Sequence, residues 1–206
     1  MIRECTAKDF ENIYSIINEA AKAYKDVIPM DRWKEPYMSH AELQHEINER
    51  VRFFGYEENS ALLGIMGIQN VDDVSLIRHA YVKTKFQNQG IGKQLLNYLC
   101  NQATRPVLLG TWAAATCAIR FYEKHGFKQV TKETKDTLLR KYWTSPERKA
   151  ETSVVLAETK TGSYNCPFLV GKTSSALSIR CLENMQNVSR LSRAVKRATF
   201  LSLNAY

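Results

Sequence analysis

The chain has 206 residues, a net charge of +8, and hydrophobic and charged fractions of 44% and 24%. This length suits one domain with an extension, and the composition is ordinary for a soluble globular protein. The sequence contains no stretch near the roughly 20 apolar residues that a membrane span needs, and no apolar run follows its first residues. We therefore expect a cytoplasmic protein without a transmembrane segment or a secretory signal.

The five cysteines are scattered along the sequence. They include no Cys-x-x-Cys pair and no zinc-type spacing, so we expect no metal site. In a reducing compartment the expected state is a set of structural thiols without disulfides.

The first half of the chain predicts two helices and then a run of strands. Residues 2–5 form a short strand, and apolar residues at helical spacing follow from Phe10 to Ala20. Ser39 is a typical cap for a second helix over residues 41–50. Three strands of an antiparallel run come next, over residues 51–57, 61–69 and 74–82.

The second half alternates helices and strands. A periodic helix over residues 90–103 leads to the apolar run Val107–Trp112, which predicts a buried strand parallel to its neighbour. A helix over residues 113–125 stops at Gly126. The remaining predicted elements are a strand over 127–131, a short helix over 135–143 and a strand over 152–157. Together these elements predict an α/β (α+β) domain over residues 1–160.

Residues 161–206 form a basic extension with six Lys or Arg residues and one Glu. Apolar residues at three- and four-residue spacing predict an amphipathic helix from about Ser175 to Leu203. This helix could bind a partner or a membrane surface, dock on the domain, or drive formation of a homodimer. The alternative is a poorly ordered extension without function. Charge alone supports a nucleic-acid partner, so we expect no specific one.

The segment Gln87–Gly92 lies between a predicted strand and a predicted helix. The main-chain N–H groups and the macrodipole at the start of a helix attract a phosphate. Gly90 and Gly92 leave out side chains where phosphate oxygens must approach, Gln87 can donate a further hydrogen bond, and Lys93 adds positive charge. This pattern predicts a phosphate-binding loop.

Two stretches resemble signatures of the GNAT superfamily of N-acetyltransferases. Residues 81–96 are similar to its acetyl-CoA motif, a Gln or Arg, two variable residues, then Gly-x-Gly or Gly-x-Ala. Ala118–Phe127 is similar to its second signature, Ala-Ile-x-Phe-Tyr-x-x-x-Gly-Phe. The chain also resembles uncharacterised microbial members that share the stretch Gly110–Ala115. The resemblance covers about residues 1–160.

The resemblance implies a splayed central β-sheet flanked by helices and an acetyl-CoA cosubstrate. The pantetheine arm would pair with main chain of the strand before the loop, and the pyrophosphate would lie on the loop. The residues implied to bind acetyl-CoA are Tyr81, Val82, Gln87, Asn88, Gln89, Gly90, Ile91, Gly92, Lys93, Ala118 and Phe121. Many members carry Asn where this chain has Ala115, and by the resemblance this departure would remove one hydrogen bond to the cosubstrate.

The implied reaction moves an acetyl group from acetyl-CoA to a primary amine of a small molecule or peptide, within one ternary complex. Tyr122 matches the position that protonates the leaving thiolate, and a phenol is a suitable acid for this step. The strand 74–82 has no acidic residue to serve as general base. His79 is the candidate, with Asp72, Asp73 or a water relay as alternatives, and a purely structural His79 is also open.

The alternative to an enzyme is a non-catalytic CoA-binding or scaffold module whose tail is an interaction arm. The missing strand acid and Ala115 favour it. For an enzyme, the region between the first two helices would shape the acceptor pocket. Trp33, Tyr37 and Met38 could form an aromatic wall there with Trp112 or Tyr142. Two acids of this region, Glu35 and Glu42, are candidate partners of a cationic amine. The alternative is that both are solvated surface residues.

Overall fold

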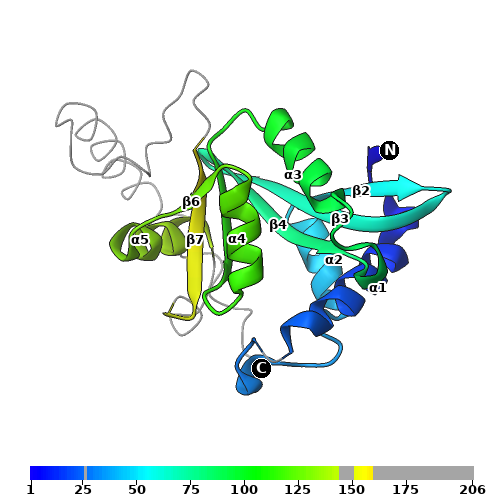
Figure 1. Ribbon diagram of the computed structural model, residues 1–206, viewed down its shortest axis with the longest axis horizontal. Helices are drawn as coiled ribbons and strands as arrows, with labels where there is room; N and C mark the ends of the chain where they lie inside the picture. The colour runs from blue at the N-terminus through cyan, green and yellow to red at the C-terminus, as the bar shows by residue number, and fades with distance from the viewer. Residues whose placement is uncertain (26, 144–150, 160–206) are drawn as a thin grey trace. The chain divides into compact units, whose positions relative to one another are not determined.

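The computed structural model describes residues 1–25, 27–143 and 151–159. The extension 161–206 and its predicted helix lie outside the described residues. The strands and helices of the described chain follow one another in the order that the sequence predicts. The strands form one mixed sheet, with helices on both of its faces (Figure 1).

The sheet has seven strands in the order β1-β2-β3-β4-β5-β7-β6. Neighbouring strands are antiparallel except β4 and β5, which are parallel, as predicted for the buried run after the third helix. The strands are β1 (Ile2–Glu4), β2 (Arg52–Glu58), β3 (Ala61–Val71), β4 (Val74–Val82), β5 (Val107–Trp112), β6 (Phe127–Gln129) and β7 (Ser153–Glu158).

The helices α1, α2 and α3 lie over the half of the sheet formed by β2–β4, whereas α4 and α5 lie over the half formed by β5–β7 (Figure 1). Their bounds are α1 (Phe10–Ala21), α2 (His40–Asn48), α3 (Ile91–Gln102), α4 (Thr116–Lys124) and α5 (Lys132–Tyr142). Short 3-10 turns occur at Ala7–Asp9, Lys22–Tyr24, Met30–Arg32 and Thr84–Phe86.

Two helix starts lie three residues from the prediction, and those of α2 and α3 lie within one residue of it. The fourth helix begins at Thr116 and not at 113, because the main-chain N–H of Ala113 donates to Thr152 O at 2.8 Å and keeps the chain extended past β5. The fifth begins at Lys132 and not at 135, because the hydroxyl of Thr131 accepts a hydrogen bond from the main-chain N–H of Thr134 and caps an earlier turn.

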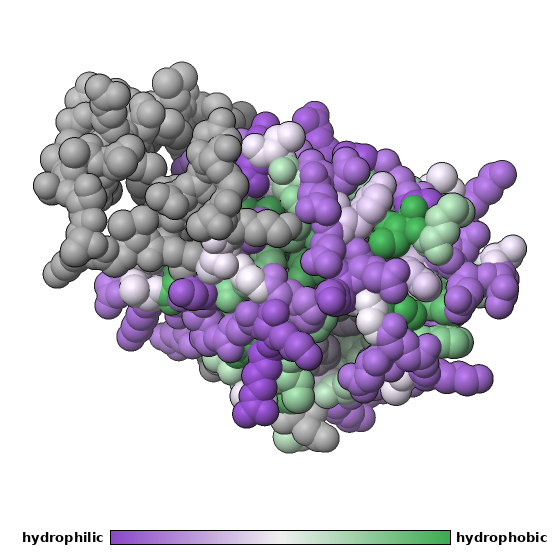
Figure 2. Space-filling model, turned by 45° about the horizontal axis from the view of Figure 1, so that its top comes forward, coloured by the Kyte–Doolittle hydropathy of each residue, from purple (hydrophilic) through white to green (hydrophobic). Residues whose placement is uncertain are grey.

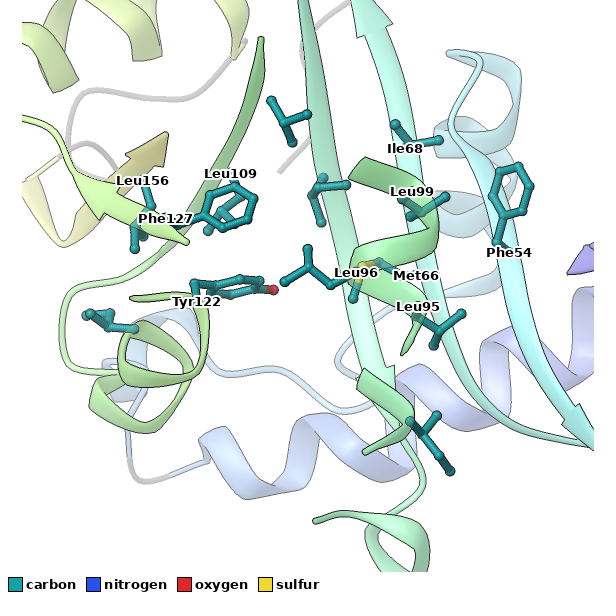
Figure 3. Close-up of a cluster of buried hydrophobic side chains, with 14 of the residues drawn as sticks. Phe54, Met66, Ile68, Leu95, Leu96, Leu99, Leu109, Tyr122, Phe127 and Leu156 are labelled. Carbon is teal, nitrogen blue, oxygen red and sulfur yellow. The ribbon is translucent and has the colours of Figure 1, made fainter. Parts of the chain in front are cut away.

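Apolar clusters lie on both faces of the sheet, because successive residues of a strand point to opposite sides. On β3, Met66 packs with Leu95 and Leu99 of α3. Its neighbour Ile65 packs with Ile17 of α1. Figure 3 shows the α3 side of this arrangement. These side chains are almost fully buried, and the burial of each contributes about 1.5–3 kcal/mol to the free energy of folding relative to an exposed position.

The same alternation along β5 explains why α4 and α5 pack on opposite faces of the sheet. Leu109 of β5 belongs to the cluster that contains Ile119 of α4. Its neighbour Leu108 packs with Leu138 and Leu139 of α5. The two helices therefore cover opposite faces of the sheet near β5.

The strands β4 and β5 separate toward their C-terminal ends. They pair only between Ser75–Ile77 and Val107–Leu109. Beyond that point β4 continues to Val82 beside β3, and β5 continues to Trp112 beside β7. The facing edges of the two strands are thus left without strand partners, and the sheet opens into a splay.

A β-bulge lies on the splayed part of β4. Tyr81 is opposite Ile65 and Arg78 is opposite Gly67. Two residues of β4, His79 and Ala80, therefore lie opposite the single residue Met66 of β3. His79 has a φ of 50°, in the left-handed region that non-glycine residues rarely adopt. The extra residue bends the strand and redirects its side chains.

The face of the molecule seen in Figure 2 is mainly polar over the described residues. Figure 2 shows hydrophilic side chains over most of the visible face, with hydrophobic ones in small separate groups. Among the residues that the structure describes, no helix is long and apolar enough to cross a membrane.

Candidate active site

A cavity of about 210 Å³ lies at the place where β4 and β5 separate. Its walls come from both strands, from α4 and from the chain around the first two helices. Aromatic side chains form much of the lining: Tyr24, Tyr37, Tyr81, Trp112, Tyr122 and Trp143. Main-chain groups of the splayed edges, aromatic rings and hydroxyl groups thus meet in one space.

The loop after β4 leads into an uncapped helix. Gly90, with a φ of 82°, is the N-cap of α3 and supplies no side chain to its first N–H groups. Asn88 also has a positive φ, of 61°. The first N–H groups of a helix have no partner within it, so they and the positive end of the dipole are available to an anion.

Side chains of this loop bind its own main chain. The amide of Gln87 donates to Val82 O at 3.1 Å, and that of Gln89 donates to Lys85 O at 3.3 Å. The ring of Phe121 lies next to Gly92, where an added Cβ would be 3.4 Å from it. Hydrogen bonds within the loop therefore hold the start of α3 beside α4, and no side chain caps the first main-chain N–H groups of this helix.

Tyr122 lies on α4 with 8% of its surface exposed, and it lines the cavity. Its ring packs edge-on against Phe121 and Phe127, at centroid distances of 5.1 and 5.9 Å. Figure 3 shows the ring projecting from α4 with the hydroxyl at its far end. Burial raises the pKa of this phenol above its ordinary value, so it keeps its proton at neutral pH.

His79 lines the cavity and faces Glu46 of α2. Its Nε2 is 3.0 Å from Glu46 Oε2, although the N–H does not point along that line, so the contact is mainly electrostatic. The other carboxylate oxygen accepts a hydrogen bond from Arg78 at 3.0 Å. Burial raises the pKa of Glu46, but His79 and Arg78 outweigh it and hold this pKa below the ordinary value.

Comparison with known protein families decides the identity of this domain. Residues 15–141 match the family model described as the acetyltransferase (GNAT) domain. The chain belongs to the GNAT acetyltransferase family.

Solved structures of other GNAT proteins share the fold. A PaiA N-acetyltransferase from Thermoplasma acidophilum, in complex with coenzyme A, is 20% identical with a TM-score of 0.58, covering 77% of this chain and 97% of its own. The ribosomal-protein-S18-alanine N-acetyltransferase from Escherichia coli is 20% identical with a TM-score of 0.56, over 79% and 96% of the two chains. At these identities the likeness shows the fold alone.

In this GNAT domain the two other acids considered as bases lie away from the cavity. Asp72 and Asp73 form the turn before β4, whereas the cavity begins at Ile77. At 3.3 Å per residue, Asp73 is about 13 Å along the strand from Ile77. Asp73 also binds Tyr142, as described below, and these positions do not suit a general base.

The expected aromatic wall forms from a different set of residues. Tyr37 and Trp112 line the cavity as expected, and Trp33 packs beside Tyr37 at 5.7 Å. Met38 instead lies in the core with α1, and Tyr142, the last residue of α5, lies in the core between that helix and the sheet. The two acids considered as partners of a cationic amine bind other residues of the chain. Glu42 caps α2 and pairs with Lys34, and Glu35 binds Lys25 and Trp33.

Residues of the site that the sequence did not indicate include two aromatic residues and one acid. Tyr24, just after α1, and Trp143, just after α5, line the cavity, and the ring of Trp143 lies over Gly110. Glu46 reaches His79 from α2. Spacing gave no signal for Glu46, because a carboxylate on an amphipathic helix is ordinarily solvated.

Ala115 lies at the N-cap of α4 and is 3% exposed. It provides no side-chain oxygen for the first N–H groups of that helix, which an Asn at this position would. The departure from the family pattern therefore leaves a second uncapped helix start next to β5.

Proposed function

We propose that this GNAT protein transfers an acetyl group from acetyl-CoA to a primary amine of a small molecule or peptide, by direct transfer between the two bound substrates. The observation that carries the proposal is the arrangement around the splay. The cavity between β4 and β5 contains Tyr122, and β4 leads through a short loop to the uncapped start of α3. The coenzyme A complex of the PaiA neighbour supports the same cosubstrate.

The residues present fit acetyl-CoA. The N–H groups between Asn88 and Lys93 would hold the pyrophosphate, helped by the dipole of α3 and by the space that Gly90 leaves, where an added Cβ would meet no atom within 4 Å. The free edge of β4 at Tyr81 and Val82 would pair with the amides of the pantetheine arm, as an added strand does. Ala118 and Phe121 would line that arm.

The chemistry needs an acid and a base. As the amine attacks the thioester carbonyl, a C–N bond forms and the C–S bond breaks. Tyr122, protonated at neutral pH because of its burial, would give its proton to the departing thiolate. His79, on the cavity wall, would take the proton that the amine must lose. Solvent then restores both groups.

Two observations favour a second candidate, a non-catalytic CoA-binding module. Splayed β4 carries no acid, and Ala115 provides no side-chain oxygen at the start of α4. Such a module binds acetyl-CoA but releases no thiol with any amine.

The experiment is a screen of primary amines against the full chain, with release of the CoA thiol as the readout and calorimetric titration of acetyl-CoA beside it. The panel includes small alkyl and aryl amines, amino acids, and peptides with a free N-terminus or a lysine. Amine-dependent thiol release supports the enzyme. Tight binding of acetyl-CoA with no release for the whole panel supports the module, and no binding contradicts both.

A further inference from the structure

Glu46 and His79 form a pair that the motifs of this chain do not predict. Glu46 lies on α2, His79 lies on the splayed part of β4, and their side chains are only 18% and 15% exposed. A carboxylate is rarely this buried unless a cation or hydrogen bonds hold it. A buried acid–histidine pair at the wall of the cavity therefore suggests that the pair has a function in the site.

The β-bulge is what allows the pair to form. On a regular strand Arg78 and His79 would point to opposite faces of the sheet. In this structure both reach Glu46, at 3.0 Å each, and His79 adopts its left-handed φ of 50° at the same place. The backbone thus accepts an unfavourable conformation while His79 stays on the cavity wall and faces α2.

The charge of Glu46 orders the imidazole. Arg78 and His79 keep the carboxylate ionised by holding its pKa low, despite its burial, with a smaller contribution from His45. Nε2 lies 3.0 Å from the ionised Oε2 without an aligned hydrogen bond. A lone pair on Nε2 would be repelled by this charge whereas an N–H is attracted, so Nε2 is the nitrogen that carries the hydrogen. Nδ1 is then left as the acceptor, and no described residue hydrogen-bonds it.

We propose that Glu46 is a positioning residue for acetyl transfer: it keeps the hydrogen of His79 on Nε2, so that Nδ1 takes the proton of the acceptor amine. The inference rests on the proposed function. It assigns the role of general base to His79 of β4, held by Glu46 of α2, in place of an acidic residue on β4. As the proton arrives, the imidazolium gains the attraction of the carboxylate beside it, as in other acid–histidine pairs.

The test compares Glu46→Gln, His79→Ala and the double variant in the full chain. Glu46→Gln keeps the shape of the side chain and removes its charge. We expect kcat to fall about 10- to 100-fold, less than the full contribution of a general base, with acetyl-CoA affinity unchanged. The matched control is Glu49→Gln at the exposed end of α2, which we expect to retain full turnover.

The double variant separates positioning from a structural role. If Glu46 acts through His79, Glu46→Gln causes no further loss of kcat in the His79→Ala background. An equal loss in both backgrounds overturns the proposal, and so does full activity of Glu46→Gln alone.

The ring nitrogens provide a readout that needs neither a variant nor turnover. The ¹⁵N chemical shifts of His79 in the unmutated protein report which nitrogen carries the hydrogen. We expect the Nε2–H form, and the Nδ1–H form overturns the proposal. A protein that binds acetyl-CoA and shows the Nε2–H form, yet releases no thiol with any amine, contradicts the proposed function and not the pairing.

Discussion

The hydroxyl of Tyr142 donates to Asp73 Oδ1 at 2.6 Å, and Lys141 Nζ lies 3.0 Å from the same oxygen. Burial raises the pKa of Asp73, but these two partners outweigh it and hold the pKa below the ordinary value. The acid that the sequence offers nearest to β4 is therefore engaged in tying α5 to the turn before that strand.

Asp73→Asn tests this structural role. The amide can still accept from Tyr142 but loses the attraction of Lys141, so we expect the free energy of unfolding to fall by about 1 kcal/mol. Turnover at saturating substrates should stay within twofold of the unmutated protein. Urea denaturation and thiol release measure the two effects, and a loss of turnover of a hundredfold would show that Asp73 acts in the chemistry.

Gly90→Ala tests the loop before α3. Its φ of 82° strains an alanine by about 1 kcal/mol, and the added methyl faces the open space where the pyrophosphate would lie. We expect acetyl-CoA to bind at least about tenfold more weakly, which is about 1.4 kcal/mol.

Gly126→Ala is the matched control for that variant. Gly126 follows α4 with a φ of 88°, so the alanine meets similar strain away from the loop. We expect a similar loss of unfolding free energy and an unchanged calorimetric affinity for acetyl-CoA. Equal weakening of binding by both variants would refute a specific role for the loop.

His79→Gly and His79→Ala separate the backbone of the bulge from its side chain. Glycine tolerates a φ of 50°, so we expect the glycine variant to be more stable than the alanine variant by about 1 kcal/mol. Both lack the imidazole and should lose turnover equally at neutral pH. The deficit should shrink as the pH approaches about 10, where an alkyl amine loses its own proton. A deficit that stays constant with pH would argue against His79 as the base.

Asp9 provides a stability prediction with a defined pH dependence. Its carboxylate accepts two hydrogen bonds from Arg3 at 2.9 Å and one from Thr6 N–H at 2.8 Å, and these bonds, mainly those from Arg3, lower its pKa. A carboxyl whose pKa is lower in the folded state adds stability above its unfolded pKa of about 3.9, and this is lost as the pH falls toward the folded value.

We therefore expect Asp9→Asn to lower the free energy of unfolding by about 1–3 kcal/mol at pH 7. The difference from the unmutated protein should narrow as the pH drops below about 4, because protonation of Asp9 then weakens, in the unmutated protein, the bonds that the variant already lacks. Denaturation curves between pH 3 and 7 check this, and a difference independent of pH would refute it.

The sequence predicts the sheet better than the site. Val74–Val82 and Val107–Trp112 agree with β4 and β5 to the residue, because the first follows the Asp72-Asp73 turn and the second is an apolar run after Pro106. The bulge left no signal, since a histidine in the left-handed region looks like any other residue of a strand. Glu46 was missed for a related reason: its burial depends on the bulge that brings His79 toward α2.

Tyr122 is the residue on which the enzymatic account depends most. The most direct test measures amine-dependent thiol release and acetyl-CoA affinity for Tyr122→Phe beside the control Tyr142→Phe, a buried tyrosine that does not line the cavity. The account predicts that Tyr122→Phe loses turnover about 10²- to 10⁴-fold with unchanged affinity, while Tyr142→Phe keeps its turnover. Full turnover of Tyr122→Phe would contradict it.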